Sequence, residues 1–299
     1  MKLVVSALVL ALSLSASAQA PSPPVESVIV TAPAQRPEDA LNDFVFNHAA
    51  PTTVLGKIAR WKRGICPLTL GLTPKLNQFV NQRIIRMAMA AGAPLDDREP
   101  CRPDLLVIAT GEPQALMDFV RLKRPILLGF HYKSQAARIA TMRLPIQAWY
   151  STATEDFNGF IQGDLPALDV MKAIPGGADG FGTTAVSGNR AIGNGLKSEL
   201  TTAIVVIDTT KIAGRQIGAL ADYIAMLALS QARSYEECQP VPTITNLFAA
   251  SCVDGTRPDG ITDIDTTYLR GLYKMDAGRT LLGERSSIAY EMKKDLGGY

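Results

Sequence analysis

Histidine is scarce in this chain, and His48 and His131 are the whole supply in 299 residues. Zinc peptidases of the His-Glu-x-x-His type need two imidazoles one helical turn apart, so that both reach one ion, and a glutamate that activates water. Such a motif would stand in the predicted helix at 214–231, GRQIGALADYIAMLALSQ, where the comparable stretch 221–225 reads ADYIA. A methyl group has no lone pair to donate, so we expect no metal at this helix and no cofactor.

Other signatures are missing as well. The chain has neither the Gly-x-Ser-x-Gly nucleophile elbow nor a Ser-x-x-Lys pair. Beyond the N-terminal region, no segment has the roughly 18 uninterrupted apolar residues that a membrane helix needs. The formal net charge is only +2, so the molecule as a whole is not expected to attract nucleic acid. We therefore expect neither a transmembrane protein nor a general nucleic-acid binder.

The N-terminal region predicts export. It begins Met-Lys, continues with an apolar run at 3–14 and ends in SASAQA, which together are typical of a secretory signal peptide. We place the signal peptide at 1–18, a linker rich in proline and alanine at 19–37, and a single domain at 38–299. This organisation predicts a periplasmic or secreted protein.

Four cysteines fit an oxidising compartment, where disulfides persist. Cys66, Cys101, Cys238 and Cys252 contain no Cys-x-x-Cys pair, which a four-cysteine zinc site usually needs. Three pairings are possible, and we favour Cys66 with Cys101 and Cys238 with Cys252, the nearest neighbours in sequence.

Apolar periodicity and turn residues predict an α+β fold, with a mixed β-sheet flanked by helices. Thr262 is a predicted N-cap with Asp265 at the third helical position, a start that resembles a capping box. The segment 175–195 has seven glycines and predicts a long irregular loop. The expected elements are helix 37–49, strand 65–72, helix 72–94, strand 104–110, helix 112–122, a hairpin or two short strands in 145–162, strand 201–211 and helices 214–231, 261–276 and 283–296.

Two residues are weak catalytic candidates. Asp222 falls where a peptidase would carry its glutamate, although the apolar spacing of the helix also fits a core helix with Asp222 as a polar residue at its margin. His131, in GFHYKSQ, could serve a serine, but a lone loop histidine is more often solvated. His48 ends a predicted helix, where an imidazolium cation would suit the helix dipole.

Charged clusters offer further binding candidates. Trp61, Lys62 and Arg63 lie in a basic group that also contains Lys57 and Arg60, and such groups can meet lipid head groups or an anionic envelope polymer. A second basic group lies at 121–124. Charge runs are more often solvated faces than binding sites.

Four aspartates between 254 and 265 offer oxygen ligands to calcium, but the EF-hand order is absent. Helix capping and turn formation explain the same residues, and we prefer that interpretation.

The segments RWKRGICPLTLGL, DLLVIAT, ALADYIAMLAL, PTITNLF and GITDIDTTYLRGLY resemble those of uncharacterised secreted proteins of proteobacteria. More distantly, the chain is similar to a bacterial zincin-like (metallopeptidase-like) family of unknown function, and PTITNLF at 242–248 and TDIDTTYLRGLY at 262–273 match its last two motifs. The resemblance covers most of 57–275 and implies a metallopeptidase-like scaffold. The chain departs from it at Ala221 and Ala225, where the zinc ligands are missing.

Three functions are compatible with these observations. The first is a non-catalytic binding module on a degenerate metallopeptidase-like scaffold, whose surface beside Asp222 binds an unknown protein or peptide of the cell envelope. The second is a hydrolase with an unrecognised active site, in which substitution of Asp222 or His131 would abolish turnover. In a binding module, the same substitutions would leave stability nearly intact. The third is an envelope-associated protein that binds anionic lipid or polymer through the group around Trp61.

Overall fold

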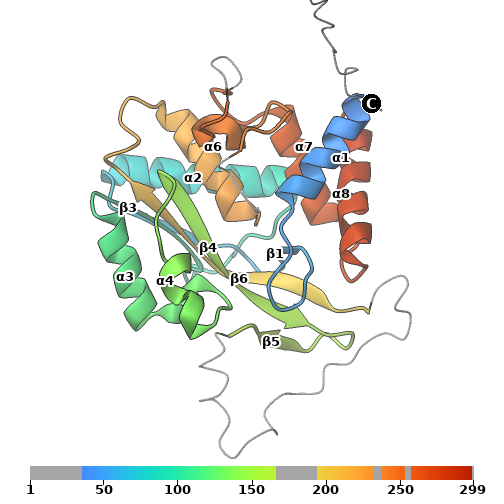
Figure 1. Cartoon of the computed structure of the whole chain (residues 1–299), viewed down its shortest axis with the longest axis horizontal. Coiled ribbons are helices and arrows are strands. Elements are labelled where there is room, and N and C mark those ends of the chain that lie inside the picture. The colour runs from blue at the N-terminus through green and yellow to red at the C-terminus, as the bar shows by residue number, and fades with distance from the viewer. Residues whose placement is uncertain (1–35, 166–193, 232–236, 253–256, 298–299) are drawn as a thin grey trace, which may run out of the picture. The chain divides into compact units, whose positions relative to one another are not determined.

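A mixed sheet forms the centre of the computed structural model, which describes residues 36–165, 194–231, 237–252 and 257–297. Within these residues six strands join in the order β2, β3, β6, β4, β5, and β1 pairs with β6 on the edge that β3 also uses. β1, β2 and β3 run parallel to their partners, whereas β4 is antiparallel to both β6 and β5. The predicted mixed sheet is therefore confirmed. The strands are β1 Ala59–Trp61, β2 Pro67–Leu70, β3 Leu105–Thr110, β4 Ile146–Glu155, β5 Ile161–Gly163 and β6 Lys197–Asp208 (Figure 1).

β6 is buried on both faces. Ala203, Val205 and Ile207 alternate with Ile204 and Val206, and the two sets belong to two different apolar clusters. Successive side chains of a strand point to opposite faces, so a continuous apolar run needs cover on both sides. The run TAIVVID thus determines that helices pack on each face of the sheet.

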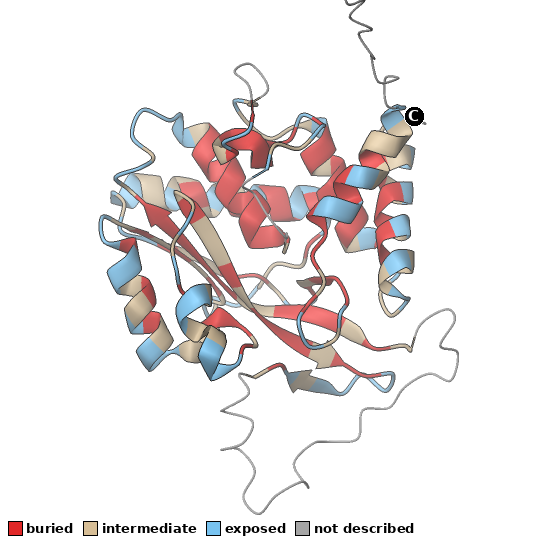
Figure 2. Ribbon diagram, in the orientation of Figure 1, coloured by how far each residue is buried: buried red, intermediate tan, exposed pale blue. Residues whose placement is uncertain are grey.

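Helices cover the two faces unequally. α2, α6, α7, α1 and α8 share the larger apolar cluster, whereas α3 contributes Met117 and Val120 to a smaller cluster on the opposite face (Figures 1 and 2). No helix among the described residues is long and apolar enough to cross a membrane. The helices are α1 Pro37–His48, α2 Pro74–Ala91, α3 Pro113–Lys123, α4 Ala136–Ile139, α6 Ile217–Leu229, α7 Asp263–Lys274 and α8 Leu281–Asp295, with short 3-10 helices η1 Pro125–Leu128, η2 Lys133–Gln135 and η3 Ile244–Phe248.

Local sequence signals explain where α2 and α7 begin and end. Thr73 caps α2 ahead of Pro74, and α2 stops at Gly92, whose φ of 76° lies in the left-handed region. Such a backbone conformation suits glycine because it lacks a Cβ. Thr262 and Asp265 form the expected capping box at the start of α7. The capping box predicted at Thr262 is therefore confirmed.

Several elements differ from the expectation. The three-residue strand β1 has too few residues to show a period, and it forms only because its backbone pairs with Ser198–Leu200 of β6. β6 begins at Lys197, four residues earlier than expected, because β4 pairs along nearly its whole length. The predicted loop at 175–195 lies almost wholly outside the described residues, as does the region 1–35.

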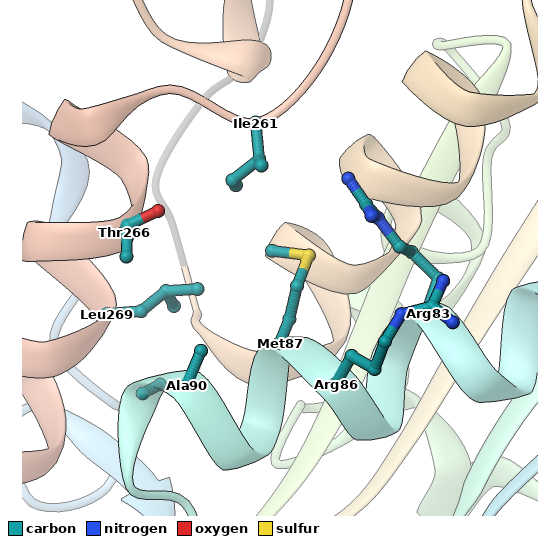
Figure 3. A pocket seen from close by; sticks show the side chains of 8 residues that line it. Arg83, Arg86, Met87, Ala90, Ile261, Thr266 and Leu269 are labelled. Carbon is teal, nitrogen blue, oxygen red and sulfur yellow. The ribbon is translucent and has the colours of Figure 1, made fainter.

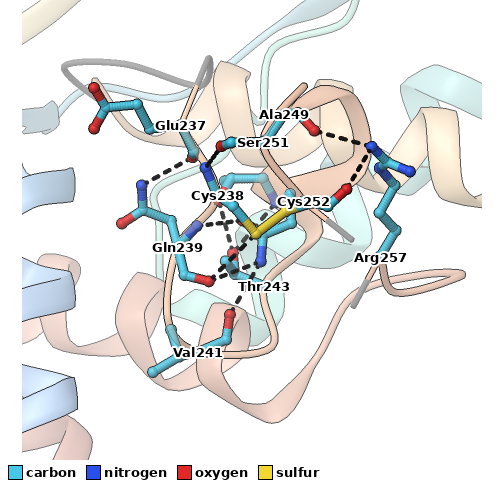
Figure 4. Close-up of a disulfide and its surroundings, with 11 residues drawn as sticks. Glu237, Cys238, Gln239, Val241, Thr243, Ala249, Ser251, Cys252 and Arg257 are labelled. Atoms are coloured by element: carbon cyan, nitrogen blue, oxygen red, sulfur yellow. Dashed lines mark hydrogen bonds between the residues drawn. A yellow bond between two sulfur atoms is a disulfide. The ribbon is translucent and has the colours of Figure 1, made fainter. Parts of the chain in front are cut away.

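Two disulfides link the pairs that the sequence favours, Cys66 with Cys101 and Cys238 with Cys252. The second closes a loop around η3, in which the amide of Asn246 donates to the carbonyls of Gln239 and Val241 at 3.2 Å (Figure 4). Persistent disulfides fit an oxidising compartment.

Asp265 joins η3 to α7 from a fully buried position. Its carboxylate accepts hydrogen bonds from the Thr243 hydroxyl, from the Ile244 N–H at 2.8 Å and from the Thr262 N–H at 3.0 Å. Burial raises its pKa, and these donors oppose that effect. The side chain therefore satisfies several buried donors at once.

We predict that Asp265→Ala lowers the free energy of unfolding by about 3 kcal/mol or more, because it leaves buried donors without an acceptor. Asp263→Ala, on the exposed side of the same first turn, should cost less than about 1 kcal/mol. Urea unfolding of both variants measures the difference. Equal losses would show that the network around Asp265 contributes nothing beyond the helix dipole.

His48 corrects a sequence expectation. It ends α1, but its ring is buried, stacks on Phe44 at 4.8 Å and meets the edge of Tyr268 at 4.8 Å between centroids. Burial lowers its pKa to about 3, so the ring is neutral near pH 7. The proposed cation at the helix end is therefore wrong, because the aromatic packing removes the imidazole from water.

This lowered pKa predicts an acid-sensitive contribution to stability. The unfolded chain binds a proton at His48 near pH 6.5, whereas the folded chain binds it only near pH 3. Between these values protonation favours unfolding, so stability falls as the pH is lowered, by up to about 1.4 kcal/mol per pH unit. His48→Leu should flatten this part of the profile, measured by urea unfolding between about pH 7 and pH 4.5. Parallel profiles for the two proteins would contradict the assignment.

Candidate functional site

Asp222 lies within α6, a helix that is buried on every side from Ala219 to Leu229. The side chain of Arg83 on α2 pairs with both carboxylate oxygens of Asp222, with Nη2 at 2.7 Å from Oδ2. Oδ2 also accepts the N–H of Ile261, just before α7, at 2.9 Å. Asp222 therefore joins α2, α6 and the segment before α7.

This position corrects two expectations about α6. Asp222 is 1% exposed, so it does not lie at the helix margin, whereas Ile217, expected in the core, is 38% exposed. Ala221 and Ala225 are fully buried, and their methyl groups pack inside the larger apolar cluster. Small side chains suit a helix that lies against the sheet, α2, α7 and η3 at once.

We predict that Asp222 and Arg83 contribute to stability as a coupled pair, which revises the expectation that Asp222 can be replaced without loss of stability. Arg83→Met leaves a buried carboxylate without its cation and should cost about 3–5 kcal/mol. Adding Asp222→Asn removes that charge, so the double variant should be more stable than Arg83→Met alone.

The control for this cycle is Arg36→Met, because Arg36 pairs with carboxylates at the surface, with 72% of its side chain exposed. Its cost should be below about 1 kcal/mol. Urea unfolding measures all the variants. If the losses of unfolding free energy caused by Arg83→Met and by Asp222→Asn alone add up to the loss in the double variant, the coupling is refuted.

His131 lies on the other side of the sheet from Asp222. It follows η1, which packs against α3 and β4, and its Nδ1 is 2.7 Å from the carbonyl oxygen of Gly129. The ring is 4% exposed, so the expectation of a solvated histidine is wrong. The structure does not bring the two weak catalytic candidates together.

The basic group around Trp61 is largely engaged within the protein. Trp61 is 2% exposed, and its indole N–H donates to the Ala228 carbonyl at 2.8 Å. Lys62 pairs with Glu155, and Arg63 pairs with Glu199 at 2.6 Å.

Lys57 and Arg60 also bond to the protein itself. Lys57 donates to the carbonyl of Arg279, and Arg60 donates to three carbonyls at the end of α7, those of Leu272, Tyr273 and Met275. Reversal of these charges would therefore disturb the fold as well as any anion binding.

Trp61 and Arg63 also line a polar cleft of about 630 Å³, which opens where β1 ends and β3 begins along β6. Arg98 and Arg102 also line it. Much of its charge is compensated internally, because Arg98 pairs with Asp96 and Arg63 with Glu199.

A second pocket, of about 210 Å³, lies between α2 and α7 (Figure 3). Met87 and Leu269 provide apolar walls from the two helices, and Ile261 lies across the pocket from them. Arg83 and Arg86 line it from α2. Arg83 is held by Asp222, whereas Arg86 forms no salt bridge with any described residue. The remaining lining residues are Ala90, Ala91 and Thr266.

Sequence reasoning missed Arg83 and Arg86 as functional candidates. On α2, Arg86 and Met87 follow Arg83 by three and four residues, the spacing of one helix face. The sequence does contain two arginines beside an apolar stripe. It does not show that α7 stands opposite them, so the pocket could not be inferred.

Neither known families nor known proteins supply a match. No family model, no curated protein and no solved structure matches the chain. Within the described ranges, no group of three or more histidine, cysteine, aspartate or glutamate side chains is placed to hold a metal ion.

Proposed function

We propose that this protein is a non-catalytic binding protein of the cell envelope, periplasmic or secreted, which holds the C-terminal residue of a peptide or protein between α2 and α7. The site lies beside the Asp222 region of α6, on a scaffold that we infer to be a degenerate relative of metallopeptidases. The observation that carries the proposal is Arg86, a cation without an ionic partner among the described residues, at the edge of an apolar pocket.

The pocket suits one apolar side chain. A cavity of about 150 Å³ lined by aliphatic side chains can hold benzene, and this pocket has about 210 Å³. Met87 and Leu269 are buried and contribute apolar surface from opposite helices. Methionine adapts its shape easily, which favours a family of leucine-like or phenylalanine-like side chains over a single one.

The positive charge at the pocket favours a ligand that carries the carboxylate of a chain terminus. A carboxylate near Arg86 would gain a charge-assisted hydrogen bond, and a planar guanidinium can bind both of its oxygens. Arg83 is already paired with Asp222, so Arg86 is the lining cation left to bind the carboxylate. An apolar side chain with a carboxylate one carbon away is the chemistry of a C-terminal residue.

The contacts of Asp222 support a binding role over a catalytic one. Both carboxylate oxygens already accept hydrogen bonds, from Arg83 and from the Ile261 N–H. A general base needs a free oxygen within reach of substrate. Asp222 instead fixes Arg83 and the segment at Ile261, so that two sides of the pocket are preorganised.

The test is binding of short peptides ending in Leu or Phe, measured by fluorescence anisotropy with the chain from Gln19. We expect Arg86→Gln to weaken binding by about tenfold or more, the loss of one charged hydrogen bond. Lys75→Gln removes the same charge from the exposed start of α2 and should leave affinity unchanged.

Peptides with an amidated C-terminus should bind the unchanged protein weakly. Their affinity should be about that of free-acid peptides for the Arg86→Gln variant. Equal affinity for the acid and amide forms, or equal effects of the Arg86 and Lys75 variants, would refute the proposal. Absence of binding to every apolar C-terminus would refute it as well.

A further inference from the structure

The layer formed by α3, η1, η2 and α4 presents large apolar side chains to solvent. Phe119 is 57% exposed, Leu122 65% and Ile126 42%. Phe119 and Leu122 are three residues apart on one side of α3, and Ile126 follows in η1, which packs against α3. We call these three side chains the apolar stripe. Met117 and Val120 occupy the opposite side of α3 and pack against the sheet. The stripe therefore covers no part of the core.

The layer that carries this stripe is rich in positive charge. The segment 113–143 contains six lysines and arginines but one acidic residue, Asp118, although the whole chain has a net charge of only +2. Lys123, Arg124, Lys133 and Arg138 are exposed and form no salt bridge with the described residues. α4 contacts α3, so these cations belong to one layer of the fold (Figures 1 and 2).

We propose that this layer binds the surface of an anionic phospholipid bilayer, with the apolar stripe inserted among the acyl chains and the cations at the phosphate level. Helices that lie in a membrane interface combine these two features, an apolar face and flanking lysine or arginine. A cluster of exposed large apolar side chains also needs an explanation of its own, because isolated ones are normal but groups mark interaction surfaces.

The bilayer fits this surface better than a soluble polyanion. A polymer of sugars or phosphates would pair with the cations but leave Phe119 and Leu122 in water, whereas a bilayer accommodates both. The surface is also independent of the peptide pocket, because α3 and α2 cover opposite faces of the sheet. The protein could therefore hold a peptide while it is bound to a membrane.

The experiment is cosedimentation of the chain from Gln19 with vesicles of phosphatidylethanolamine and phosphatidylglycerol, compared with vesicles of phosphatidylcholine alone. We expect binding to the anionic vesicles that weakens as salt is added. The charge variant Lys123→Glu with Arg124→Glu should weaken binding by roughly tenfold or more. The apolar variant Phe119→Ser with Leu122→Ser should weaken it to a similar extent.

The matched controls are Lys294→Glu and Leu282→Ser on α8, which change an exposed cation and an exposed apolar side chain far from the layer in sequence. Both should bind vesicles like the unchanged protein. Circular dichroism and thermal unfolding establish that each variant is folded. Because all four changed side chains in the test variants are exposed, we expect them to fold.

Three outcomes would overturn the proposal. One is no binding to anionic vesicles at low salt, and another is equal binding to phosphatidylcholine. The third is binding that depends on Lys123 and Arg124 but not on Phe119 and Leu122, because that result would show adsorption by charge alone, without insertion of the apolar stripe. Failure of peptide binding at Arg86 would leave this proposal unaffected, because the two experiments use different surfaces.

Discussion

The fold depends on the burial of β6 from both sides. Its apolar run alternates between two clusters, and each needs a layer of helices. Apolar burial stabilises a chain by roughly 25 cal/mol per Å², so a strand with two apolar faces strongly favours helices on each. One layer contains α2, α6 and α7 and includes the pocket lined by Arg86. The other contains α3 and α4 and exposes the apolar stripe. The two proposed functions therefore lie on opposite sides of one strand.

Buried polar groups hold the larger layer together. Asp222 joins α2 to α6, Asp265 joins η3 to α7, and Glu284 on α8 accepts the Ile58 N–H at 2.9 Å next to β1. Each carboxylate receives donors from segments distant in sequence. A buried carboxylate is stable only when such donors surround it, so each specifies one arrangement of its neighbours. The packing of apolar side chains tolerates more variation than these contacts do.

Buried polar groups need hydrogen-bond partners, and this need already occupies most of the side chains that the sequence suggests for catalysis or binding. The carboxylate of Asp222 and the cations around Trp61 already bond to the protein, and His131 lies away from Asp222. Several surface cations among the described residues form no salt bridge, including Arg86 at the pocket and Lys123 and Arg124 beside the apolar stripe. In both proposals, a cation next to apolar surface selects a ligand that combines negative charge with apolar groups.

The sequence alone determined the type of most elements and the capping box at Thr262, and among three possible cysteine pairings it favoured the one that the structure has. These features depend on side chains within a few residues, or within one loop, so their causes are visible in a linear pattern. The tertiary structure decided the rest. β1 exists only because β6 lies beside it, and α6 became a core helix because four elements cover it. His48 and Asp222 are ordinary polar residues in the sequence, and only their neighbours made one neutral and the other part of a buried ion pair. The reason is physical: burial and pairing depend on distances between segments that a one-dimensional pattern does not contain.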